Sequence, residues 1–182
     1  ADSGIYLRGK GTYQINIWCW PIGSGEVYGI RNNEKNPPEV RAGVTPALKA
    51  DNPVGQWNTF VITMKGDRLT VVLNGHLIIE DALLPEGPET GPIALQHHGG
   101  MRDGEMSPAS SLVQFRNIFI RVLECANDGR FSYLPRSGFR SSPSTPKREN
   151  VPTAIRRMAR SSMKGRARLR FSFRAPGKWS LR

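Results

Sequence analysis

The strict alternation of residues 12–20 (Thr-Tyr-Gln-Ile-Asn-Ile-Trp-Cys-Trp) is the feature that most limits how this chain can fold. Successive side chains of a β-strand point to opposite faces, so this segment has one largely apolar face and one face of amides and indoles. The first face comprises Tyr13, Ile15, Ile17 and Cys19, and the second comprises Gln14, Asn16, Trp18 and Trp20. Such alternation predicts a strand that covers a core with its apolar face.

Residues 57–80 predict a three-stranded antiparallel meander. They contain three short apolar runs, and the Asn74-Gly75 pair between the last two is a strong hairpin signal. Further strands are expected over 91–98 and 112–123, whereas residues 23–56 are rich in Gly, Pro and Asn and are expected to be irregular. No long helix is expected before residue 150. Many short antiparallel strands predict an all-β sandwich or jelly roll.

The formal net charge of +11 arises from one end of the chain. Residues 1–129 hold 11 Lys and Arg against 14 Asp and Glu, whereas residues 130–182 hold 15 Lys and Arg against Glu149 alone. The high charge therefore does not characterise the first part of the chain. Segment 126–182 is rich in Arg, Ser and Pro, and we expect a largely disordered basic tail. The alternative is an arm that binds nucleic acid or an anionic surface.

The polar face of the 12–20 strand is suited to a carbohydrate. Sugar rings present apolar C–H faces that stack on aromatic rings, and hydroxyl groups that need donors and acceptors such as amides. The candidate substrate-binding residues on this face are Gln14, Asn16, Trp18 and Trp20. The alternative is that the two indoles pack under the irregular segment 23–56.

Two adjacent histidines end the strand predicted over residues 91–98. Strand parity places His98 with Gln96 on the more polar side and His97 with Leu95 on the apolar side. The two histidines are therefore not expected to share a metal ion. The last strand adds polar side chains to the set, and we expect one concave sheet face to be lined by Gln14, Asn16, Gln96, His98, Gln114 and Arg116.

A glycosidase that works by double displacement is not expected. Such enzymes need two carboxyl groups within about 10 Å of each other. The chain has no Glu-x-Asp-x-x-Glu run on a strand, and most of its carboxylates, Glu26 among them, fall in predicted loops.

Four segments carry a recognisable pattern in order along the chain. They are Ser-Gly-Ile-Tyr-Leu-Arg-Gly (3–9), Tyr-Gln-Ile-Asn (13–16), Gly-Pro-Ile-Ala-Leu-Gln-His-His-Gly (91–99) and Val-Gln-Phe-Arg-Asn-Ile-Phe-Ile-Arg (113–121). Together they resemble the 3-keto-disaccharide hydrolase domain family, also described as a 3-keto-glucoside lyase/hydratase domain. The resemblance implies a concanavalin-A-like jelly roll of antiparallel sheets over residues 1–125. Because family domains begin some tens of residues earlier, we expect an N-terminally truncated domain, followed by the unrelated tail 126–182.

The resemblance also implies a reaction, in which a 3-keto-glycoside loses its C2 proton and then its C1 substituent before water adds. It implies His98 as the base, and Arg116, Arg8 or a divalent metal ion as the electrophile, with His98 the strongest candidate metal ligand. The chain departs from the family at Gln14 and His97, where acidic residues are usual. The competing interpretation is therefore a non-catalytic carbohydrate-binding sandwich.

The partner implied by the resemblance is a carbohydrate, and the implied location is secreted or periplasmic. The sequence contains no run of about 20 apolar residues, so no transmembrane segment is predicted.

Overall fold

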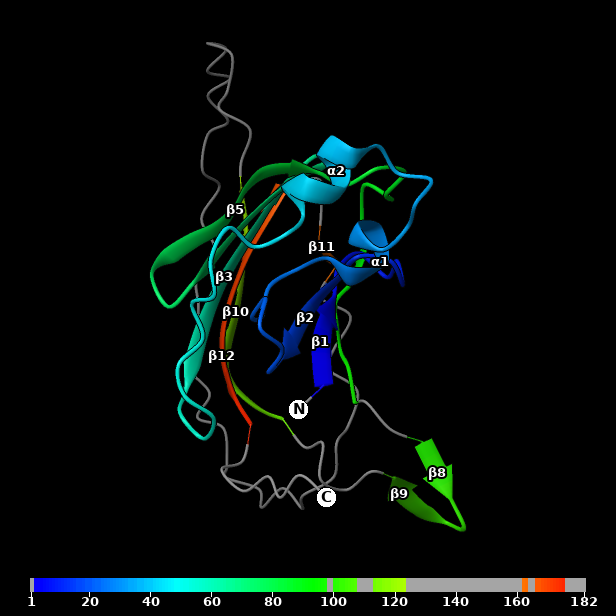
Figure 1. Ribbon diagram of the computed structural model, residues 1–182. Helices are drawn as coiled ribbons and strands as arrows, with labels where there is room; N and C mark the ends of the chain where they lie inside the picture. Colours follow the sequence, from blue (N-terminus) through cyan, green and yellow to red (C-terminus); the bar gives the residue numbers. More distant parts are fainter. Residues whose placement is uncertain (1, 98–99, 108–112, 124–161, 164–165, 176–182) are drawn as a thin grey trace, which may run out of the picture.

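The protein is an all-β sandwich whose two main antiparallel sheets have three and five strands, and two further sheets have two strands each (Figure 1). The computed structural model describes residues 2–97, 100–107, 113–123, 162–163 and 166–175. Figure 1 shows the five-stranded sheet curving around the smaller sheet that contains β1 and β2. Apolar side chains from both sheets form one core between them. The predicted fold class, an all-β sandwich, is confirmed for these residues.

The smaller sheet has the strand order β2-β1-β7. Its strands are β1 (Asp2–Tyr6), β2 (Gln14–Trp18) and β7 (Ala94–Leu95). Ile5 lies opposite both Ile15 and Leu95, which places these three side chains on the core face. The predicted alternation holds as far as Trp18, where the strand ends, and Cys19 is exposed rather than buried.

The larger sheet has the strand order β10-β12-β3-β4-β5. Its strands are β3 (Asn58–Lys65), β4 (Arg68–Leu73), β5 (His76–Leu83), β10 (Gln114–Val122) and β12 (Arg166–Arg174). The predicted meander is confirmed by β3, β4 and β5, which pair in sequence order. Asn74 and Gly75 connect β4 to β5 with φ values of 52° and 85°, the left-handed geometry that a tight hairpin turn requires.

The prediction of a separate basic tail was wrong for β12. This strand lies between β10 and β3 and pairs with both along most of its length. Its alternate residues Leu169, Phe171 and Phe173 are buried, because arginine and serine occupy only the positions that face away from the core. The composition of the tail as a whole concealed this two-residue period. The rest of the predicted disordered tail, except 162–163 and Ala175, lies outside the described residues.

The remaining elements are short. They are α1 (Tyr28–Arg31), α2 (Pro38–Gly43), β6 (Gly91–Pro92), β8 (Gly100–Arg102), β9 (Glu105–Ser107) and β11 (Ser162–Met163). The segment 23–56, expected to be irregular, thus contains two short helices, and the strand expected over 91–98 is reduced to β6 and β7. Of the helices described, neither is long and apolar enough to cross a membrane.

Tyr13 joins the small sheet to the chain that follows β5. Its ring is fully buried, and its hydroxyl donates a hydrogen bond of 2.8 Å to the carbonyl of Leu84. Burial raises the pKa of Tyr13 from 10.0 to about 12. The neutral phenol is therefore the form that the folded state favours.

We expect this burial to make the protein sensitive to alkali. Because the folded-state pKa of Tyr13 exceeds the unfolded value, its contribution to stability is complete below pH 10 and is lost as the pH rises from 10 through about 12. Urea unfolding at several pH values should show this loss in the wild type. Tyr13→Phe should lose about 1 kcal/mol at neutral pH, with a flatter alkaline profile. The exposed Tyr28, changed to Phe, is the matched control, and an unchanged profile in Tyr13→Phe would contradict the assignment.

Candidate functional site

Polar side chains gather on the side of the small sheet that faces away from the core. Because Ile15 and Ile17 face the core, Gln14, Asn16 and Trp18 face the opposite way. Gln96 joins them, since its backbone N–H donates a 2.8 Å hydrogen bond to the Gly4 carbonyl and continues the pairing of β7 with β1. We call the group formed by Gln14, Asn16, Gln96 and the neighbouring Glu26 the polar face; within it, Gln14 and Gln96 are partly exposed, whereas Asn16 and Glu26 are buried.

Gly4 allows two of these amides to meet. The Nε2 group of Gln14 donates a hydrogen bond to Oε1 of Gln96 across β1. A Cβ atom on Gly4 would lie 2.5 Å from Gln14 Nε2 and 2.9 Å from the carbonyl oxygen of Ile15. The glycine of the Ser-Gly-Ile-Tyr pattern therefore leaves the space in which the Gln14 side chain lies.

We expect Gly4→Ala to disturb this amide pair and the sheet beneath it. The backbone oxygen of Ile15 cannot move as freely as the Gln14 side chain, so the substitution should cost about 1–3 kcal/mol in the free energy of unfolding. Gly11→Ala is the matched control, because a Cβ atom there has no neighbour within 4 Å. Equal stability of the two variants in urea unfolding would show that Gly4 does not have this role.

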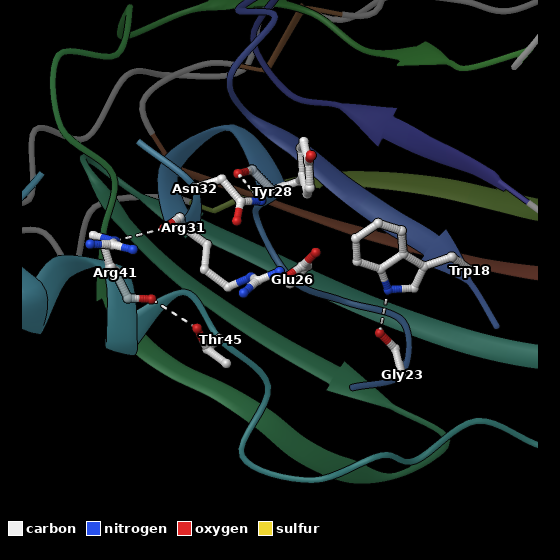
Figure 2. A network of polar contacts seen from close by, with 8 residues as sticks. All are labelled: Trp18, Gly23, Glu26, Tyr28, Arg31, Asn32, Arg41 and Thr45. Carbon is white, nitrogen blue, oxygen red and sulfur yellow. Dashed lines mark hydrogen bonds and ion pairs between the residues drawn. The ribbon is translucent and has the colours of Figure 1, made fainter. Parts of the chain in front are cut away.

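Glu26 brings a carboxylate to the edge of the polar face. The segment before α1 runs beside β2, with a hydrogen bond of 3.0 Å from Asn16 N to Glu26 O and one of 2.8 Å from Gly25 N to Asn16 O. The Glu26 side chain is fully buried and forms an ion pair with Arg31 (Figure 2). Burial raises the pKa of Glu26, and the contacts with Arg31 and Asn16 oppose that shift. The carboxylate thus holds Arg31 in place.

Three aromatic rings form a groove beside this ion pair. The Trp18 ring meets Trp20 and Tyr28 edge to face, with centroid separations of 6.2 and 5.7 Å. Trp18 is oriented by a 2.7 Å hydrogen bond from its Nε1 to the Gly23 carbonyl, which Figure 2 shows. The groove has a volume of about 520 Å³, and its lining comprises Trp18, Trp20, Pro21, Ile22, Tyr28, Arg31 and Asn32. We call it the aromatic groove.

The aromatic groove offers a ligand both apolar and charged contacts. Trp20 is 61% exposed and Tyr28 48% exposed, so both rings remain accessible to a ligand. The Arg31 side chain is 32% exposed and lines the groove while Glu26 lies behind it. The volume is within the usual range for small-molecule sites.

The structure brings together some of the predicted site residues and separates others. Gln14, Asn16, Trp18 and Gln96 lie on one side of the small sheet, and Trp20 follows directly after β2. The inclusion of Gln114 and Arg116 was wrong, because both belong to β10 in the other sheet. Gln114 accepts a hydrogen bond of 2.6 Å from Arg174, and the Arg116 guanidinium stacks 3.8 Å from the Trp57 ring.

Arg8 and the two adjacent histidines are placed as follows. Arg8 is buried and donates a 3.2 Å hydrogen bond to the carbonyl of Pro88, and burial lowers its pKa. This contact ties Arg8 to the loop that precedes β6. His97 is partly buried, and its Nδ1 has no hydrogen-bond partner among the described residues. His98 lies outside the residues that the structure describes.

The described residues of the polar face do not fit a divalent metal ion. The polar face contains one carboxylate, Glu26, which contacts Asn16 and is paired with Arg31. Within the described ranges, no group of three or more His, Cys, Asp or Glu side chains could hold a metal ion. Hard cations in proteins usually take several carboxylate or carbonyl oxygens.

The sequence pattern and the folded sheet together identify the domain. Residues 1–121 match the model of the 3-keto-alpha-glucoside-1,2-lyase-like domain family. The chain belongs to this family. The match spans the whole small sheet, the β3–β5 meander and most of β10. No curated protein and no solved structure matches the chain.

Within this 3-keto-alpha-glucoside-1,2-lyase-like domain, sequence reasoning missed Glu26, Arg31 and Tyr28. All three come from the segment that was expected to be an irregular loop. The structure shows a local reason for their position: Gly25 has a φ of 114° and lies so close to Ile78 that a Cβ atom would meet its Cδ1 at 2.3 Å. Only glycine fits this close approach and positive φ, and the residue after it, Glu26, then lies beside β2, where its carbonyl accepts a hydrogen bond from Asn16 N.

Proposed function

We propose that this domain cleaves 3-keto-glycosides on the polar face and in the aromatic groove. The observation that carries the proposal is that a family-matched domain has amides on the outward side of its small sheet and, from Trp18 at the end of β2 onward, a groove of aromatic rings with a partly exposed arginine. The amides of Gln14 and Gln96 are suited to sugar hydroxyls, and the rings are suited to the apolar face of a sugar or of its leaving group. Asn16 is buried and contacts Glu26, so its part in the proposal is to support that carboxylate.

The keto group makes this cleavage possible without a pair of carboxylates. A ketone at C3 acidifies the C2–H bond, so that a base can take the proton and leave an enolate. When the enolate collapses, C3=O re-forms, a double bond forms between C1 and C2, and the C1–O bond breaks. The leaving oxygen takes up a proton. Water then adds its oxygen to C1 and a proton to C2, and the net reaction is hydrolysis.

Arg31 is the described residue best suited to stabilise the enolate. Its guanidinium is fixed by Glu26 and lines the aromatic groove, so its charge is preorganised before any negative charge develops on the ketone oxygen. Glu26 acts through Arg31 and is therefore a positioning residue. The base remains a prediction: we assign it to His98 on the family pattern and not on strand parity, because β7 ends at Leu95.

A carbohydrate-binding module without catalysis is the second candidate. The exposure of Trp20 and Tyr28 favours it, because exposed rings beside amides can hold a sugar without any reaction. The two functions differ in what they require of the substrate. Binding through rings and hydroxyls does not need a ketone, whereas cleavage by C2 deprotonation does.

A matched pair of substrates tests the proposal. An aryl 3-keto-glucoside and the corresponding unoxidised aryl glucoside should be incubated with the protein, and release of the phenol measured. The proposal predicts release from the keto compound only. Binding of both compounds without release from either would establish the binding module instead, and equal release from both would rule out the keto-dependent reaction.

A further inference from the structure

The outward side of β10 and β12 carries a cluster of arginines. Because Leu169, Phe171 and Phe173 face the core, the intervening residues of β12 face the other way. On β10, Arg121 lies opposite Arg168, and Arg116 lies opposite Ser172. Opposite side chains of an antiparallel pair are about 5 Å apart at Cβ. The arginine face, as we call it, consists of Arg116, Arg121, Arg168, Arg170 and Arg174.

The arginine face lacks compensating acids among the residues that the structure describes. The strands β10, β12, β3 and β4 contain no Asp or Glu, and the described ion pairs include none of these arginines. Like charges placed opposite each other, as Arg121 and Arg168 are, destabilise a sheet. The surface is therefore complementary to a ligand that brings several negative charges.

Neighbouring side chains hold part of this surface in place. The Nε group of Arg168 donates a 3.1 Å hydrogen bond to Thr63 Oγ1, and Arg116 and Arg174 lie 3.8 and 4.8 Å from the Trp57 ring centroid. Arg168 and Arg170 are nevertheless exposed. Guanidinium groups that are anchored yet exposed can form paired hydrogen bonds to carboxylates or sulfates.

The shape of the surface argues against nucleic acid as the ligand. Readers of duplex DNA insert a helix or ribbon into a groove, whereas these arginines project from the face of a sheet. Proteins that bind single-stranded nucleic acid offer several exposed aromatic rings on which bases stack. Here two guanidinium groups cover the Trp57 ring. Phe119 is the one large aromatic side chain that is exposed on the described part of β10 and β12.

We propose that the arginine face binds an acidic polysaccharide, with uronate carboxylates or sulfates paired to Arg168, Arg170 and Arg121. The choice of a polysaccharide rests on the proposed function, because the opposite sheet is proposed to act on a sugar. The arginine face would then hold the domain on a glycan while the polar face acts on a glycoside.

Binding to polygalacturonate tests this inference directly. The full chain should bind the polymer, and the affinity should fall as salt is added. The double variant Arg168→Gln/Arg170→Gln should bind about tenfold more weakly. The control Lys35→Gln/Lys49→Gln removes the same charge from exposed positions outside the arginine face and should bind like the wild type. Thermal unfolding of each variant checks that the sheet is intact.

The inference fails if both double variants lose affinity equally, or if neither loses any. It also fails if oligo-dT or phosphatidylserine vesicles compete better than polygalacturonate at equal charge, since either result assigns the surface to another partner. Because binding is measured without turnover, this test and the keto-glucoside test give separate results. Polygalacturonate binding without cleavage of a 3-keto-glucoside would contradict the proposed function alone.

Discussion

Phe171→Ala should destabilise the whole sandwich, by about 3–5 kcal/mol in the free energy of unfolding. Phe171 is 1% exposed, and its ring centroid lies 5.4 Å from that of Phe60 and 6.2 Å from that of Phe115. The three rings come from β12 and the strands on either side of it, so a cavity at this position weakens the packing of β12 against both β10 and β3. A domain of this size is commonly stable by only 5–15 kcal/mol, so the loss is a large fraction of the total.

Phe119→Ala is the matched control for this prediction. Phe119 belongs to the neighbouring strand β10 but is 63% exposed, so removal of its ring should leave the stability nearly unchanged. Urea unfolding of the two variants and the wild type gives the comparison. Similar stability of Phe171→Ala and the wild type would mean that β12 is not part of the core.

The positions of the small-sheet residues could be predicted from sequence because one local rule governs them. Strand parity correctly put Gln14 and Asn16 on the face opposite Ile15. The same rule could not assign Gln114 and Arg116 to a sheet, because parity gives the side on which a residue lies but not the strand beside it. That choice depends on pairing between distant segments, here β10 with β12.

The strand Arg166–Arg174 could not be predicted from composition, for a different reason. Its composition is basic, but its apolar residues fall at every second position and are covered by β3, β10 and the core. When the amino-acid composition is averaged over the long basic segment 126–182, the alternation of this nine-residue strand is not visible. In the structure this strand pairs with β3 on one side and with β10 on the other.

Arg31→Gln should reduce cleavage of a 3-keto-glucoside by about 100- to 1,000-fold, the usual effect of removing one preorganised stabiliser of an oxyanion. The guanidinium lines the aromatic groove, and glutamine cannot supply its charge to the enolate. The loss should appear in kcat more than in KM, because the charge matters most when the enolate forms. Arg68→Gln is the control, since Arg68 lies on β4 near Asp67 and Asp81, away from the small sheet.

Glu26→Gln separates positioning from direct catalysis. Without the carboxylate, Arg31 loses its anchor but keeps its charge, so turnover should fall less than in Arg31→Gln. The pH profile of kcat should also lose any limb that arises from titration of Glu26, whose pKa is raised by burial. An effect of Glu26→Gln larger than that of Arg31→Gln would instead make Glu26 the base.

The most direct measurement of the central claim is the fate of hydrogen at C2 when the full chain cleaves a 3-keto-glucoside in D2O. Elimination followed by hydration predicts a product with deuterium at C2, formed far faster than by exchange without protein. The same mechanism predicts that the Arg31→Gln variant forms little of this labelled product, whereas the Arg68→Gln variant forms it like the wild type. A product that retains hydrogen at C2, or labelling that Arg31→Gln leaves unchanged, would contradict the account.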